Sequence, residues 1–158
     1  MSKATEIGPK DMRNWLMLSR LHLTEVDHVD PQRALKEADR ANAFTQLRDP
    51  RFKRILAQAY LRNEEYEDAL THAEAAIEGG DEPAYGHLIA AIASARLGRS
   101  DEAGEHFKQS IASWPGQVKD GVIVSAEKGF LWFDTLQELE TLRGEAEPLV
   151  QEVGIAAP

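Results

Sequence analysis

Small and apolar residues recur through the middle of the chain with the spacing of amphipathic helices. Within residues 52–60 they fall at i, i+3, i+4, i+7 and i+8, which is one buried face of a helix. The polar residues 63–65 interrupt this stripe, and a second stripe covers residues 66–77. Two glycines, at 79 and 80, follow it, and glycine commonly ends a helix. The pattern predicts two antiparallel helices joined by a short turn.

The pattern then repeats at a fixed distance. The same residue types return 34 positions later in four pairs: Ala57 and Ala91, Ala69 and Ala103, His72 and His106, Ile77 and Ile111. A period of this length is typical of proteins built from stacked helical hairpins. We therefore expect a second hairpin over residues 84–115, in the register of the first hairpin over residues 50–83.

The N-terminal part predicts a less regular hairpin, over residues 10–49. Residues 1–9 contain no periodicity and are expected to form a flexible lead. One helix is expected from Lys10 to near Glu25 and another over residues 31–47. Asp30-Pro31 provides the N-cap and first helical residue of the second of these helices. The alanines of this segment do not keep the 34-residue register, so we interpret it as a degenerate repeat.

The residue pattern changes after Pro115. Two short runs of β-branched and aromatic residues, 121–124 and 130–133, are separated by five residues that include glycine, which indicates a β-hairpin. Trp132 is expected to dock this hairpin onto the last repeat. A helix follows, with Gly144 and Pro148 as its C-terminal bounds, and residues 149–158 are expected to be frayed. Residues 116–148 would thus cap the open end of the helical array.

Eight residues carry a resemblance to the tetratricopeptide repeat (TPR) family: Ala57, Tyr60, Ala69, Ala91, Gly98, Ala103, Phe107 and Pro115. The resemblance covers residues 50–115 as two repeats, and the degenerate segment extends it to residue 10. Two positions depart from the family pattern, because Ala73 and Ser94 stand where large or aromatic residues are usual. The resemblance implies an all-α or mainly α fold, a short right-handed solenoid of antiparallel hairpins that binds other proteins.

In this family the first helix of each hairpin, helix A, lines the concave face that holds the ligand. The candidate partner-binding residues, which we call the A-helix row, are Arg13, Arg20, Arg51, Arg54, Gln58, Arg62, Tyr85, Leu88, Ile92 and Arg96. Arginine suits the bidentate recognition of carboxylates. The row therefore predicts an adaptor or co-chaperone-like module that binds an acidic or amphipathic peptide segment. Alternatively, these arginines only solvate the helices or pair with neighbouring acids.

The family's carboxylate clamp, which grips chaperone C-termini, fits this chain poorly. It uses Lys and Asn at several of these positions, where this chain offers Arg54 and Gln58, and Leu88 does not fit.

Charge is unevenly distributed along the sequence. The net charge is −9, but residues 1–62 carry 12 basic and 8 acidic residues whereas residues 63–158 carry 6 and 19. An acidic balance argues against nucleic-acid binding, which needs a basic surface. The asymmetry leaves an alternative function open, a structural subunit that self-assembles through ends of opposite charge. An ordinary acidic surface with chance clustering would give the same numbers.

Length and composition exclude several other kinds of protein and site. The chain has 158 residues, which favours one compact domain, and it contains no cysteine, which excludes disulfides and thiolate metal sites. No apolar run approaches the length that spans a bilayer, so we expect a cytoplasmic protein without membrane insertion.

Motifs for catalysis are missing from the sequence. There is neither a Gly-rich phosphate loop nor a nucleophile motif, and paired acids stand at helix starts, where they stabilise the helix. His22 and His28 lie near three acids but without a recognised metal-ligand spacing, so a polar loop explains them. His72 and His106 should lie a hairpin apart, too far to share one ion. We expect no enzymatic activity, cofactor or metal.

Overall fold

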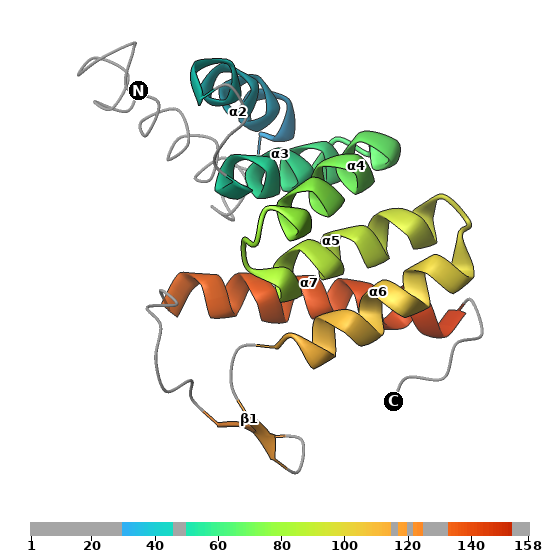
Figure 1. The fold of residues 1–158 in the computed structure, drawn as a ribbon. Coiled ribbons are helices and arrows are strands. Elements are labelled where there is room, and N and C mark those ends of the chain that lie inside the picture. Colours follow the sequence, from blue (N-terminus) through green and yellow to red (C-terminus); the bar gives the residue numbers. More distant parts are fainter. Residues whose placement is uncertain (1–29, 46–49, 115–116, 120–121, 125–132, 153–158) are drawn as a thin grey trace. The chain divides into compact units, whose positions relative to one another are not determined.

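Helices make up nearly all of the residues that the structure describes (Figure 1). The structure is a computed structural model, and it describes residues 30–45, 50–114, 117–119, 122–124 and 133–152. The chain divides into two units, Met1–Asp81 and Glu82–Pro158. Unit 1 contains helices α2 to α4, and unit 2 contains α5, α6, a small β-hairpin and α7.

Helix α2 (Pro31–Thr45) begins as its sequence predicts. The backbone N–H of Arg33 donates to Oδ1 of Asp30 at 3.0 Å, and the N–H of Ala34 donates to the Asp30 carbonyl at 2.9 Å. Asp30 is therefore the N-cap, and Pro31 takes the first helical position, where its missing N–H costs nothing. The helix is described as far as Thr45, and the last two residues of its predicted range, 46 and 47, lie outside the described residues.

Helices α3 (Pro50–Arg62) and α4 (Tyr66–Glu78) form the helical hairpin of unit 1. Asn63, in the turn, donates from its side-chain amide to the carbonyls of Ala59 and Pro31, both at 2.8 Å. One side chain thus ends α3 and ties the turn to the start of α2. Glu64 completes the turn with a φ of 63°, a left-handed conformation that a non-glycine residue adopts at some cost.

The glycine pair after α4 serves two different purposes. Gly80 has a φ of 80° and supplies the left-handed conformation expected at a helix end. Gly79 stays in the right-handed region, with φ −73°. A Cβ added there would lie 2.6 Å from Cβ and 2.9 Å from Cγ of Pro50. Gly79 is therefore required by close approach to the first residue of α3.

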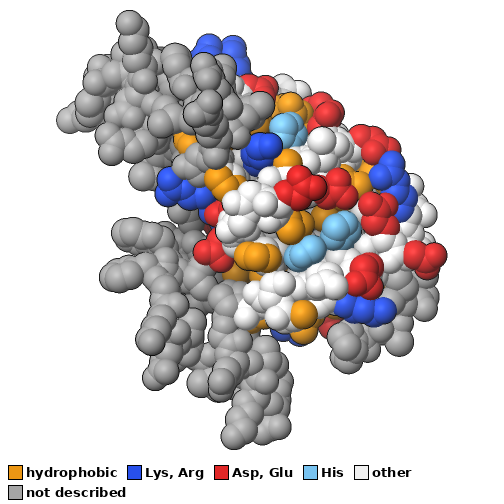
Figure 2. Space-filling view, viewed as in Figure 1, with side chains coloured by type: hydrophobic (Ala, Val, Ile, Leu, Met, Phe, Trp, Pro, Cys, Tyr) orange, Lys and Arg blue, Asp and Glu red, His pale blue; other side chains and the backbone are white. Residues whose placement is uncertain are grey.

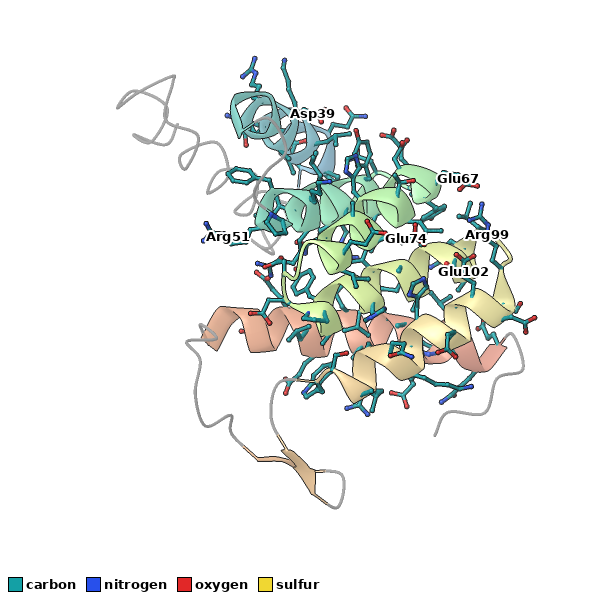
Figure 3. All side chains as sticks on the ribbon, viewed as in Figure 1. Asp39, Arg51, Glu67, Glu74, Arg99 and Glu102 are labelled. Carbon is teal, nitrogen blue, oxygen red and sulfur yellow. The ribbon has the colours of Figure 1, made fainter. Side chains whose placement is uncertain are left out.

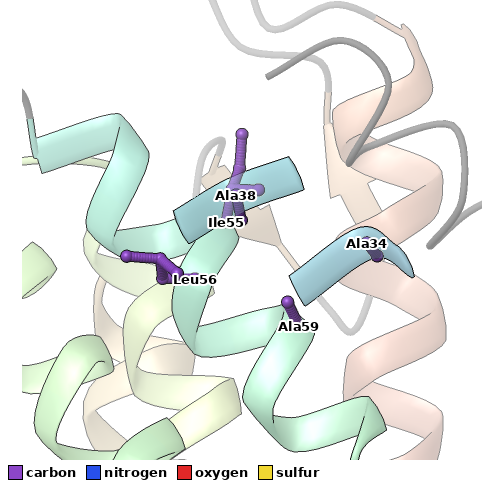
Figure 4. Packing of buried hydrophobic residues seen from close by; sticks show 5 residues of the cluster. All are labelled: Ala34, Ala38, Ile55, Leu56 and Ala59. Atoms are coloured by element: carbon purple, nitrogen blue, oxygen red, sulfur yellow. The ribbon is translucent and has the colours of Figure 1, made fainter. Parts of the chain in front are cut away.

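The core between α2 and α3 is built largely from small side chains. Ala34 and Ala38 of α2 meet Ile55, Leu56 and Ala59 of α3 in one buried cluster (Figure 4). Since alanine adds little thickness to a helix, the two backbones approach closely. The larger Ile55 and Leu56 then fill the remaining space.

Unit 2 is organised around α5 (Pro83–Arg96). Every residue from Ala84 to Ser94 is buried except His87. A helix that is apolar all round belongs in an interior, and α5 contacts both α6 (Ser100–Ala112) and α7 (Phe133–Glu152). Gly98, with φ 76°, makes the turn between α5 and α6.

Helix α7 is longer than the sequence predicts. We expected Gly144 and Pro148 to bound it and residues from 149 onward to be frayed, but the helix continues through Pro148 to Glu152. Its buried stripe explains the difference, because it extends beyond the proline: Leu139, Leu142, Ala146 and Val150. Proline weakens a helix by removing one hydrogen bond, and burial of the next turn outweighs that loss.

α7 is held to the rest of unit 2 at two polar points. The hydroxyl of Tyr85, on α5, donates to Oε2 of Glu138 at 3.1 Å. The guanidinium carbon of Arg143 lies 5.8 Å from the ring centroid of Trp114, a buried residue just after α6. This distance allows a cation–π interaction. α7 is therefore an integral part of unit 2.

The β-hairpin pairs different segments from those predicted. Strand β1 (Gln117–Lys119) runs antiparallel to β2 (Val122–Val124), with Val118 opposite Ile123. The strand predicted over 121–124 is therefore largely present, but its partner precedes it. The predicted partner over 130–133 is wrong at Phe133, which starts α7. The remainder of that run, including Trp132, lies outside the described residues.

The physical reason for the different pairing is the shorter connection. Asp120-Gly121 stands between the two strands, and Asp-Gly is typical of tight two-residue hairpin turns. The mainly α fold of consecutive helical hairpins is confirmed. The domain boundaries expected from the sequence stay a prediction.

Candidate functional site

In unit 1 the A-helix row is divided between surface and interior. Arg51 is exposed and points away from α3 (Figure 3). Arg54 is less accessible to a partner protein. Its Nε lies 2.6 Å from Oδ2 of Asp81, and the side chains of Arg54 and Asp81 are 17% and 9% exposed. Gln58 is 5% exposed, and Arg62 is half-buried. Among the row's arginines that the structure describes in unit 1, Arg51 and Arg62 are thus more accessible to solvent than Arg54.

The Arg54–Asp81 ion pair has a structural role. It joins the first turns of α3 to a residue three positions after the end of α4, and so it closes the hairpin at its open side. Breaking a largely buried ion pair by removing one partner leaves an uncompensated charge. Substitution of Arg54 would therefore disturb the fold as well as any binding.

In unit 2 the corresponding face of α5 is filled by the chain itself. Tyr85, Leu88 and Ile92 are 1%, 0% and 4% exposed, so they do not line an open groove as the sequence suggested. Their spacing of i, i+3 and i+7 places them on one helical face, and Tyr85 bonds α7. We infer that α7 lies along this face. Only Arg96, at the end of α5, remains exposed.

The composition of α7 shows which kind of helix packs on α5. Residues 133–152 include six acidic residues and one basic residue, together with the buried stripe described above. α7 is thus an acidic amphipathic helix. Its bond from Glu138 to a tyrosine of the A-helix row places one of those acids at the edge of the contact.

A histidine lies at the same repeat position in each hairpin, with a different neighbour in each. In unit 1 the imidazole of His72 stacks on the ring of Tyr60, with centroids 5.2 Å apart and planes 4° apart. Burial lowers the pKa of His72 from 6.5. Lys53 lowers this pKa further, while Asp68 and Asp39 act against the decrease.

In unit 2 the equivalent histidine meets another histidine. Nδ1 of His106, on α6, lies 3.1 Å from Nδ1 of His87, on α5, and the ring centroids are 5.4 Å apart. Both rings are half-buried, and Figure 2 shows histidine side chains reaching the surface. Burial lowers the pKa of His87, His106 lowers it further, and Glu105 raises it. We call these two residues the histidine pair.

The histidine pair was missed in the sequence, although a signal for it exists. In an antiparallel helical hairpin, residues equally distant from the turn face each other. Ala90 and Ala103 are such a pair around the turn between α5 and α6, and His87 and His106 lie one helical turn further out on each side. The 34-residue comparison aligned His106 with His72 and so directed attention to the wrong pair.

Several predicted residues cannot be placed. Arg13 and Arg20 of the A-helix row lie outside the described residues, as do His22 and His28 of the histidine–acid loop. Among the helices that the structure describes, none has the length and apolar character needed to cross a membrane.

Comparison with known proteins agrees with the helical repeats. The family model described as tetratricopeptide repeat matches the chain twice, over residues 23–82 and 56–118. Each match spans parts of more than one hairpin, and together they include α2 to α6. A search of curated protein sequences found no match.

Proposed function

Because the chain belongs to the tetratricopeptide repeat family, a family of protein-interaction modules, we propose that it acts as an adaptor that binds an acidic amphipathic helix of a partner protein. The role is one of binding and not of catalysis. The partner's helix would lie on the face of a hairpin's first helix, where the A-helix row supplies arginines.

The observation that supports this proposal is the packing of α7 on α5. There the chain's own acidic amphipathic helix contacts the face that the family uses for ligands, through a buried apolar stripe and the Tyr85–Glu138 hydrogen bond. On α3 the equivalent positions are Arg51, Arg54 and Gln58, so a partner helix there would meet a more polar surface. Arg51 stands 34 positions before Tyr85, so it is the equivalent residue on α3. It is exposed and offers a charged contact where α5 has Tyr85.

Arginines at the ends of the A helices extend the charged contact. Arg62 and Arg96 are 34 positions apart and end α3 and α5, respectively. A cation at this position also stabilises the negative end of the helix dipole. Their role in binding must therefore be separated from this local role, so circular dichroism must show that a variant of Arg96 keeps its helices.

Affinity capture from a lysate of the source cell, followed by mass spectrometry, tests the proposal. The variant Arg51→Glu with Arg96→Glu reverses two exposed charges of the row and should lose the partners that the parent chain captures. The variant Arg99→Glu with Lys108→Glu makes the same change in net charge on exposed positions near or on α6 and should retain them. Equal capture by both variants, with unchanged helical circular dichroism, would rule out the A-helix row as the binding surface.

A further inference from the structure

We propose that the histidine pair binds a divalent transition-metal ion, of which Zn²⁺ is the leading candidate. The two Nδ1 atoms, 3.1 Å apart, come from different helices and face each other directly. This site is independent of the A-helix row and of the partner helix proposed above.

The distance between the nitrogens matches what such an ion requires. Zn²⁺ binds histidine nitrogen at about 2.0–2.1 Å, so two nitrogens at a tetrahedral angle lie about 3.3 Å apart. The observed separation differs from this value by only a few tenths of an ångström. The ring centroids are 5.4 Å apart, so the two nitrogens point towards each other, and both rings must turn slightly to direct their lone pairs at one ion.

The surroundings supply charge and access. A carboxylate oxygen of Glu102, one turn before His106 on α6, lies within 4.8 Å of a ring nitrogen of His106. Figure 3 labels Glu102. Glu105, next to His106 in sequence, is close enough to act electrostatically on His87. Both rings are half-buried, so water can reach the ion and complete its coordination. Imidazole ligands favour Zn²⁺, Cu²⁺ and Ni²⁺ over Mg²⁺ and Ca²⁺.

A helical hairpin is a suitable support for a two-histidine site. His87 and His106 lie on helices that pack against each other, and α5 is buried along almost its whole length. The two ligands are therefore held in place before the ion arrives. Without an ion, the two rings share a hydrogen bond, and the metal titration distinguishes the two roles.

The other hairpin provides a matched control. His72 stands 34 residues before His106, and the residue 34 positions before His87 is Lys53. The first hairpin thus has a half-buried histidine at the same repeat position, with a cation where the second ligand would be. Substitution of His72 should leave metal binding unchanged.

The experiment is a titration of the untagged, EDTA-treated full chain with Zn²⁺, followed by calorimetry. We expect one equivalent to bind in the parent chain and in His72→Gln. Affinity should fall at least about ten-fold in His87→Gln and in His106→Gln. Circular dichroism verifies that each variant is folded.

A second measurement needs no substitution. Paramagnetic Ni²⁺ or Cu²⁺ added to the ¹⁵N-labelled parent chain should first broaden the amide signals around residues 87 and 106. Broadening centred elsewhere, absence of stoichiometric binding, or equal Zn²⁺ affinity in the parent and in His87→Gln would each overturn the proposal.

Discussion

Single small residues determine how closely the helices approach. Ala34, Ala38 and Ala59 are buried in the α2–α3 contact, and Gly79 lies against Pro50. At such positions the absence of side-chain atoms is the structural requirement. Glycine is not required in this way at Gly144, within α7. A Cβ added there would meet no atom within 4 Å.

These two glycines predict opposite effects of one substitution. Gly79→Ala should destabilise the chain by about 1–3 kcal/mol, because the new Cβ collides with the rigid ring of Pro50. Gly144→Ala should stabilise it by about 0.5–1 kcal/mol, because alanine restricts the unfolded chain and fits the helix. Urea denaturation measures both, and two changes of the same sign would contradict the packing described for Gly79.

A residue-scale prediction also follows for pH. Since burial lowers the pKa of His72 below 6.5, the unfolded chain binds more protons than the folded chain as the pH falls through this value. The free energy of unfolding should therefore decrease from pH 7 towards pH 5. His72→Gln should make this decrease shallower. If the variant and the parent lose stability in parallel across this range, the lowered pKa is wrong.

At the scale of elements, α7 determines what unit 2 can do. It packs on α5, bonds Tyr85, and is held by a buried stripe of its own, and we infer that it covers the face that also contains Leu88 and Ile92. Without α7 that face would expose a large apolar surface to water. The helix therefore stabilises the hairpin and also occupies the face that we propose for ligands.

The buried stripe of α7 provides the test of this role. Leu142→Ala should cost about 2–5 kcal/mol, as expected for a leucine buried in a core. Glu140→Ala, at an exposed position of the same helix, should change stability by less than about 0.5 kcal/mol. Hydrogen exchange should show faster exchange of α5 amides in Leu142→Ala. Unchanged protection of α5 would mean that α7 does not support it.

The sequence predicts local features of these elements better than their partners. Asp30-Pro31 starts α2, Gly80 follows the end of α4, and the 34-residue register locates both hairpins, because caps and buried stripes depend on nearby residues. Long-range choices were missed. The packing of α7 on α5 and the Arg54–Asp81 ion pair depend on residues distant in sequence, and Pro148 inside α7 reflects burial that outweighs a local preference.

At the scale of the whole molecule, the charge asymmetry of the sequence does not follow the folded units. Unit 1 contains the basic N-terminal stretch but also the acidic α4, so it carries 12 basic and 15 acidic residues, a net −3. Unit 2 carries 6 and 12, a net −6. Both units are acidic, which weakens the case for self-assembly through ends of opposite charge.

Light scattering tests this conclusion. Because both units carry negative charge, copies should repel each other, and the chain should have the mass of one copy at low salt and at high protein concentration. Larger species that dissociate when salt is added would instead support the self-assembling subunit.

The central claim, that the A-helix row recognises an acidic amphipathic helix, is tested most directly by one binding titration. A fluorescently labelled peptide with the sequence of residues 133–152 is added to the intact chain, and its anisotropy is followed. We predict saturable binding that weakens about ten-fold in Arg51→Glu with Arg96→Glu, since each exposed ion pair contributes up to about 1 kcal/mol. Equal affinity for the parent chain and this double variant, or no binding to either, would contradict the account.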